Sequence, residues 1–167
     1  MSSVEFHKFR ENIKNINDYT DQKEKIFDNF IDQGLPNKRN ESWKYFDLVS
    51  KSKKYIKNDI SNSEITVEDL EEKNIFYDYA DNNLSIEDYF KPCNFFKSES
   101  VVDLNVACGN QIKILDIKHT QNEPITIKID HNGKNISLPR LIINIADNVK
   151  AKINYVNSTT NGFLNLL

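Results

Sequence analysis

The sequence predicts an α+β fold, with helices in its first third and strands in its last third. A 3-4-3 spacing of apolar residues, typical of one helix face, occurs at Phe6, Phe9, Ile13 and Ile16. Residues 125–130 instead alternate apolar and polar side chains without interruption, as a half-buried strand does. Further strand signals in the last third recur roughly every 10 to 13 residues, a spacing typical of β architectures.

The helical part is predicted to contain three segments. Asp18 can cap the second helix, whose apolar residues again share one face. Gly34 supplies a stop signal for this helix, and the proline of Leu35-Pro36 disfavours its continuation. A short third helix is expected from about Asn40, and residues 50–64, rich in Ser, Lys and Asn, are expected to form a solvated connector.

The remaining segments carry strand patterns. Short strands are expected at residues 65–67 and 75–77, and further strands at residues 112–117, 125–130, 141–145, 151–156 and 162–167. This periodicity fits a sandwich, a barrel or a β-solenoid equally well.

Composition narrows the function classes. The 167 residues carry a net charge of −3 and are 38% hydrophobic, which supports a packed core and lacks the basic excess of nucleic-acid-binding domains. Charge is unevenly distributed, because residues 36–57 are net basic and residues 59–90 are strongly acidic. No apolar run approaches the roughly 20 residues of a membrane span, and no secretory signal begins the chain. We therefore expect neither nucleic-acid binding nor membrane insertion.

Side chains that could support chemistry are few and scattered. Cys93 and Cys108 fit no paired metal spacing, so we expect free thiols in a reducing compartment, the cytoplasm. His7, His119 and His131 form no metal-binding pair, and surface or turn roles are expected for them. The chain also lacks a phosphate-binding glycine loop and a GxSxG motif. We therefore predict no catalytic residue, no metal ligand and no enzyme activity.

One string is more distinctive than the rest. Residues 34–48 read GLPNKRNESWKYFDL, which describes a helix stop, a turn with two cations, and a capped helix burying Trp43 and Leu48. This string resembles the N-terminal signature of SufD in the SufB/SufD family of the SUF iron–sulfur cluster assembly machinery. Two later blocks, Leu104-Asn105-Val106-Ala107 and residues 123–143, are also similar to family segments. The residues that carry the resemblance are Gly34, Pro36, Arg39, Glu41, Trp43, Lys44, Tyr45, Leu48, Asn105, Pro124, Pro139 and Arg140.

The resemblance implies a specific architecture. It implies a helical N-terminal region (residues 1–58), an acidic connector with short strands or a helix (residues 59–100) and the first coils of a truncated right-handed parallel β-helix (residues 101–167). Family members are longer than this chain, so the resemblance is to an N-terminal portion. The apolar strand pattern at residues 163–167 agrees, because its edge would need a cover from more chain or from another protein.

The resemblance also implies a function. It implies a non-catalytic scaffold subunit that assembles with a SufB-like paralogue and a SufC-like ATPase. It implies no cofactor in this segment, since the iron–sulfur cluster is built by the parent complex. The alternative is a β-solenoid or β-sandwich interaction module unrelated to iron–sulfur assembly. A small enzyme using His119 or His131 as its base has the least support, because no nucleophile or orienting partner is identifiable.

Overall fold

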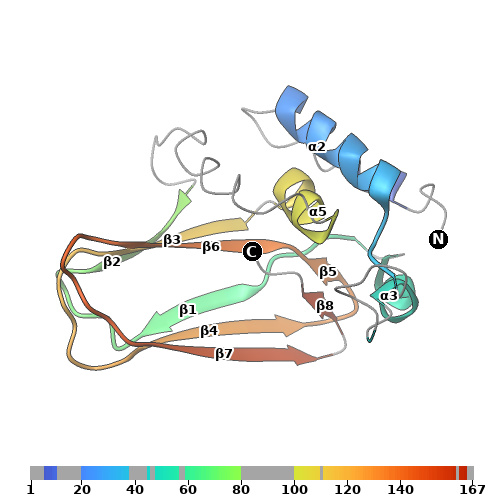
Figure 1. Cartoon of the computed structure of the whole chain (residues 1–167). Coiled ribbons are helices and arrows are strands. Elements are labelled where there is room, and N and C mark those ends of the chain that lie inside the picture. Colours follow the sequence, from blue (N-terminus) through green and yellow to red (C-terminus); the bar gives the residue numbers. More distant parts are fainter. Residues whose placement is uncertain are drawn as a thin grey trace.

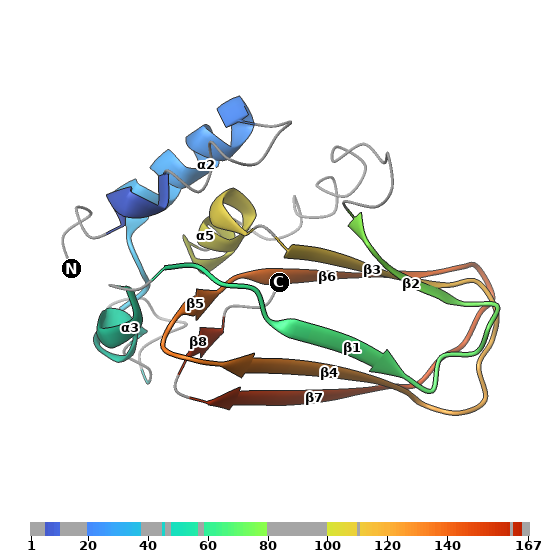
Figure 2. The same cartoon turned by 180° about the vertical axis from the view of Figure 1, so that it is seen from behind.

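The computed structural model describes residues 6–10, 20–37, 45, 48–56, 59–79, 100–109, 111–160 and 162–164. The helices are η2 (His7–Phe9), α2 (Thr20–Gln33), α3 (Leu48–Ile56) and α5 (Ser100–Cys108). The strands are β1 (Glu64–Glu68), β2 (Ile75–Asp78), β3 (Gln111–Ile117), β4 (Ile125–Asn132), β5 (Ile136–Ser137), β6 (Pro139–Ile145), β7 (Ile153–Thr160) and β8 (Phe163–Leu164). Figures 1 and 2 show the helices gathered at one end of the long strands, beside β5 and β8.

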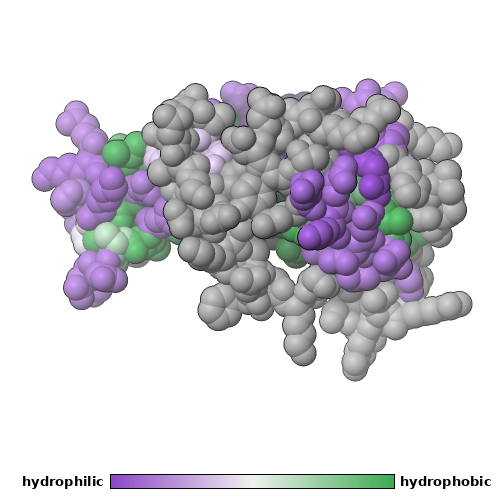
Figure 3. All heavy atoms as spheres, turned by 90° about the horizontal axis from the view of Figure 1, so that it is seen from above, coloured by the Kyte–Doolittle hydropathy of each residue, from purple (hydrophilic) through white to green (hydrophobic). Residues whose placement is uncertain are grey.

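The helices enclose one of two apolar cores. We call it the helical cluster, and its buried members are Phe6, Phe9, Phe27, Phe30, Leu35, Leu48, Leu104, Ala107, Cys108, Ile136 and Leu138. The Phe6 ring stands edge-on to the Phe30 ring, with their centroids 4.9 Å apart. The outer side of α2 is hydrophilic where the view from above shows it (Figure 3). The apolar face of α2 therefore packs into the helical cluster, as predicted.

The strands form three small sheets. Their strand orders are β1-β4-β7, β2-β3-β6 and β5-β8. β4 pairs in parallel with β7, starting at Ile125↔Ile153, and β3 pairs in parallel with β6, starting at Gln111↔Pro139. β1 and β2 pair antiparallel with β4 and β3. Both three-stranded sheets are consequently mixed.

The second core lies between these sheets. Ile125, Ile127 and Ile129 on β4 alternate with half-buried polar residues and are each 1% exposed or less. They pack with Leu115 and Ile117 of β3 in one buried cluster. The period-2 pattern read from the sequence therefore points the isoleucines into the core, as predicted.

The prediction of a right-handed parallel β-helix is wrong. The structure is a small α+β fold in which parallel pairing joins only two strands of each three-stranded sheet. The physical reason lies in residues 59–79, which form antiparallel edge strands on β3 and β4. The α+β class itself agrees with the sequence-based expectation.

Other expectations for single elements had mixed outcomes. Strands at residues 65–67 and 75–77 are confirmed as β1 and β2. The solvated connector at residues 50–64 is wrong in part, because α3 extends to Ile56 and buries Leu48 and Ser52 on one face. Helix α5 was not predicted. The start of the expected third helix lies outside the described residues, apart from Tyr45.

A buried amide network joins two turns at the far end of the strands. Oδ1 of Asn74 accepts hydrogen bonds from the backbone N–H groups of Lys118 and His119, at 2.9 and 3.0 Å. Nδ2 of Asn74 donates to Oε1 of Gln121, and Nε2 of Gln121 donates to the Asp69 carbonyl. Both amide side chains are 5% exposed, so the network replaces water for several buried backbone groups.

We expect Asn74→Ala to lower the free energy of unfolding by about 2–4 kcal/mol, because two buried backbone N–H groups lose their acceptor. Urea denaturation measures the loss. Asn122→Ala, an exposed asparagine in the facing turn, is the matched control and should change stability by less than about 0.5 kcal/mol. Equal losses in the two variants would contradict a structural role for the network.

Candidate functional site

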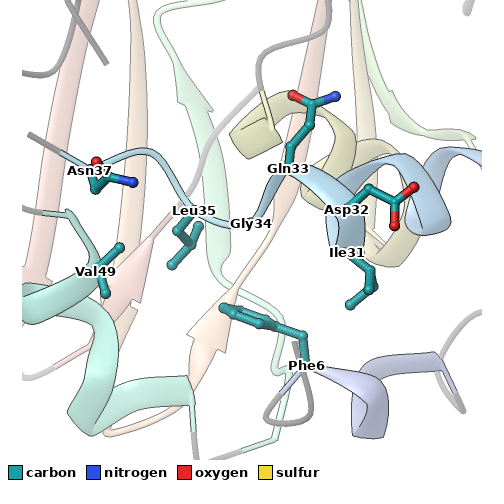
Figure 4. A pocket seen from close by; sticks show the side chains of 8 residues that line it. All are labelled: Phe6, Ile31, Asp32, Gln33, Gly34, Leu35, Asn37 and Val49. Atoms are coloured by element: carbon teal, nitrogen blue, oxygen red, sulfur yellow. The ribbon is translucent and has the colours of Figure 1, made fainter. Parts of the chain in front are cut away.

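A half-open pocket lies where α2 ends. Its volume is about 280 Å³, and it is lined by Phe6, Ile31, Asp32, Gln33, Gly34, Leu35, Asn37 and Val49 (Figure 4). These residues come from the turn before η2, from the last turn of α2 and the loop after it, and from α3. The pocket therefore includes the first part of the 34–48 string.

The end of α2 creates this pocket. Gly34 has a φ of +68°, the left-handed conformation that ends many helices, and its N–H donates to the Phe30 carbonyl at 2.7 Å. The reversal turns Leu35 and Pro36 inward, where both are buried. Val49 of α3 forms a further wall of the pocket.

The lining of the pocket combines apolar and polar side chains, and its surface is mostly polar. Phe6, Leu35 and Val49 contribute apolar atoms, and Asp32 is the only lining residue with an ionisable side chain. A nucleophile or an acid–base pair is absent from the lining residues. The volume lies just below the roughly 300–1,000 Å³ of small-molecule sites, so the pocket is small for a metabolite.

A second feature, the α5–β6 junction, joins the later two sequence blocks. Nδ2 of Asn105 donates to the Pro139 carbonyl at 3.0 Å, and both residues are buried. The junction requires glycine at position 109, because a Cβ there would lie 2.5 Å from the Asn105 carbonyl oxygen and 2.6 Å from that of Leu138. The end of α5 therefore lies directly on the link between β5 and β6.

Two cations lie at this junction. Lys23 of α2 is 3% exposed and Arg140 of β6 is 5% exposed. Burial is the main cause that lowers the pKa of Lys23 to about 8; the charge of Arg140 acts in the same direction, and Cys108 acts in the opposite direction. The junction thus tolerates a charged Lys23 at a cost in stability.

The surroundings of the buried Cys108 thiol and of the buried His131 imidazole indicate structural roles for both side chains. Burial raises the pKa of Cys108 to about 12, so the unreactive thiol form dominates at neutral pH. His131 is 2% exposed, and its Nε2–H donates to the Asn135 carbonyl at 3.0 Å. His119 is exposed, and its backbone is held by Asn74. Among the residues that the structure describes, no group of three His, Cys, Asp or Glu side chains could hold a metal ion.

The residues that carry the family resemblance have different structural positions. Gly34 lines the pocket, Pro36 is buried, and Leu48 lies in the helical cluster. Asn105, Pro139 and Arg140 meet at the α5–β6 junction, whereas Pro124 is half-buried before β4 and Tyr45 is 90% exposed. Arg39, Glu41, Trp43 and Lys44 lie outside the described residues, as do the side chain of His7 and Cys93.

Sequence reasoning missed Lys23. Positions 23, 27 and 30 share one helix face, and Phe27 and Phe30 are fully buried there. A lysine in register with two buried phenylalanines is therefore the signal that could have indicated a buried cation.

Comparisons with protein-family models, with curated proteins and with solved structures find no match to this chain. Within the described ranges, no helix has both the length and the apolar character needed to cross a membrane.

We expect Lys23→Met to stabilise the fold by about 1–3 kcal/mol at pH 7, since methionine keeps the apolar stem and removes the buried charge. The folded-state pKa lies below the ordinary lysine pKa of 10.5, so the unfolded chain binds more protons between pH 8 and 10.5. The destabilisation caused by the buried Lys23 charge is therefore full below pH 8, and it disappears as the pH rises from 8 to 10.5. Urea denaturation at several pH values should show the gap between variant and parent closing above pH 8.

Lys25→Met on the exposed side of the same helix is the control and should leave stability nearly unchanged at every pH. A destabilised Lys23→Met variant, or a gap that does not depend on pH, would contradict the buried-cation account.

The Cys108 thiol should resist modification while the protein is folded, because burial blocks access and raises its pKa. In a Cys93→Ser background, Ellman's reagent should react with Cys108 at least a hundredfold more slowly than in the same protein unfolded in urea. Equal rates in the two states would show that the thiol is accessible.

Proposed function

We propose that this chain is a non-catalytic scaffold component of a SUF-type iron–sulfur cluster assembly system. It acts by forming a complex with SufB-like and SufC-like subunits, in the cytoplasm, and the iron–sulfur cluster is cargo of the whole complex. The observation that carries the proposal is the convergence in space of the three sequence blocks that resemble the SufB/SufD family.

The convergence rests on specific contacts. Asn105 from the second block donates to the carbonyl of Pro139 in the third block. Leu35 and Leu48 of the first block pack in the helical cluster together with Leu104 and Leu138 of the later blocks. Three separate segments with family-like residues thus form one structural unit, which supports a shared origin of the three blocks over chance similarity.

The chemistry of the described residues supports a scaffold role. The residues lining the pocket include no nucleophile and no acid–base pair, the Cys108 thiol is held in its protonated form, and His131 donates to a backbone carbonyl. A buried free thiol also favours a reducing compartment such as the cytoplasm.

A second candidate is an interaction module unrelated to iron–sulfur assembly. The observation in its favour is the pocket at the end of α2, whose volume can accommodate a side chain of a partner. Under this second hypothesis the pocket is the binding site, and Val49, which lines it, is essential for binding the partner. The SUF proposal does not require this pocket.

Co-purification tests the proposal. The tagged chain, and any longer protein that contains it, is co-expressed with SufB-like and SufC-like subunits and isolated in reducing buffer. We expect all three subunits to elute together through gel filtration, while tag alone retains neither partner. Absence of a complex with the longest available form contradicts the assignment.

Val49→Glu places a charge in the pocket wall, and Lys51→Glu on the exposed side of α3 is the control. An unchanged SUF complex in both variants agrees with the scaffold proposal. Loss of binding to a different, identified partner in Val49→Glu alone favours the second candidate.

A further inference from the structure

The pocket at the end of α2 lies in a negative electrostatic potential. α2 is 14 residues long, and the pocket is built on its carboxyl end. The last carbonyl oxygens of a helix have no partner within the helix and point out of its last turn. They carry the negative end of the helix dipole, equivalent to roughly half an elementary charge. This position explains why the surface of the pocket is mostly polar.

The chain after α2 leaves most of these carbonyl oxygens available. The N–H of Gly34 donates to the Phe30 carbonyl, a single bond of the kind that ends a helix with a left-handed residue. Pro36 has no N–H with which to continue the helical pattern to the Asp32 carbonyl. Among the described residues, no backbone N–H donates to the carbonyl oxygens of residues 31–33. The end of α2 therefore presents hydrogen-bond acceptors to a ligand.

Asp32 adds a full negative charge at the same place. It is exposed, and the last turn of α2 contains no basic residue. Asp28, one turn earlier, forms an ion pair with Arg10, whereas Asp32 has no ion-pair partner among the described residues. A carboxylate in the last turn opposes the helix dipole, which favours a cation there. A position that breaks a local rule without compensation is typical of a functional site.

We propose that this pocket binds an arginine side chain of a partner protein. The methylene stem of the arginine packs on the apolar atoms of Phe6, Leu35 and Val49. Its guanidinium group donates hydrogen bonds to the Asp32 carboxylate and to the carbonyl oxygens at the end of α2. Arginine suits several acceptors around one pocket, because its planar group has five N–H donors and stays charged at physiological pH.

The size and layout of the pocket fit a single side chain. Its volume of about 280 Å³ is small for a metabolite, and it is open on one side. In Figure 4 the side chains of Phe6 and Leu35 point toward one another, whereas those of Asp32 and Gln33 point away from them. The pocket thus offers apolar atoms in one part and polar atoms in another, as an amphipathic side chain requires.

The exposed lysines of α3 restrict what can surround this arginine. Lys51, Lys53 and Lys54 are exposed, and none of them lines the pocket. Salt screens such charges over about 8 Å at physiological ionic strength, whereas a side chain in the pocket contacts its acceptors directly. The lysines nevertheless disfavour a highly basic partner segment. The occupant is therefore one arginine flanked by neutral or acidic residues.

NMR titration of the ¹⁵N-labelled chain with the peptide acetyl-Gly-Arg-Gly-amide tests this site. We expect backbone amide shifts at residues 31–35 and at Val49, with a dissociation constant on the order of a millimolar, because one exposed ion pair supplies little binding energy. The same peptide with citrulline, a neutral analogue of arginine, should bind at least about fivefold more weakly.

A matched pair of variants identifies the carboxylate. Asp32→Asn should weaken binding of the arginine peptide about threefold, whereas Asp147→Asn should leave it unchanged. Asp147 is an exposed aspartate in the turn between β6 and β7, at the opposite end of the strands (Figure 1). Circular dichroism checks that both variants fold. Equal binding of the two peptides, shifts confined to other surfaces, or full affinity in Asp32→Asn would each overturn the proposal.

A further variant excludes a cation from the same chain. Lys38 and Arg39 follow the pocket residues in the sequence, so the titration is repeated with both replaced by serine. Unchanged binding supports a partner's arginine as the occupant, whereas binding seen only in this variant shows that the chain supplies its own cation and overturns the proposal. The SUF proposal does not require the pocket, so failure of this titration and failure of the co-purification are separate outcomes.

Discussion

The close contact between the end of α5 and the β5–β6 link determines how the helical and β parts of the molecule meet. Only glycine fits at position 109, where a side chain would collide with two backbone carbonyl oxygens. This approach lets the Asn105 amide reach the Pro139 carbonyl, and it places Leu104 and Leu138 in the same buried cluster. The position of α2, which packs on α5, and of the pocket at the end of α2 depends on that contact.

The two ends of the molecule hold their buried polar groups differently. At the turn end, Asn74 and Gln121 exchange hydrogen bonds with backbone groups and with each other. At the helical end, Lys23 and Arg140 bring two like charges into a mostly apolar setting, and the lowered pKa of Lys23 records the cost. Side chains capable of chemistry, such as Cys108, are kept in unreactive forms.

Residues that act through short-range rules were predictable, and residues that act through packing were not. Gly34 ends α2 as expected, because its left-handed φ and its hydrogen bond to Phe30 are local. The residues of the α5–β6 junction were singled out only by resemblance, and their meeting was not predicted, since Asn105 and Pro139 are distant in the chain. Lys23 was overlooked because a lysine is normally solvated, and its burial depends on what α5 and β6 place over it.

The same division holds for the fold. Alternation at residues 125–130 determined which side of β4 faces the core, because side chains along a strand project with a period of two. Nothing in that period specifies a pairing partner. Tertiary structure alone decided that β1 and β2 lie antiparallel on β4 and β3, which makes the sheets mixed and leaves β6 and β7 at the open edges. Strand direction and neighbour are set by the long-range burial of both cores, whereas helix ends and strand faces follow from residues only a few positions apart.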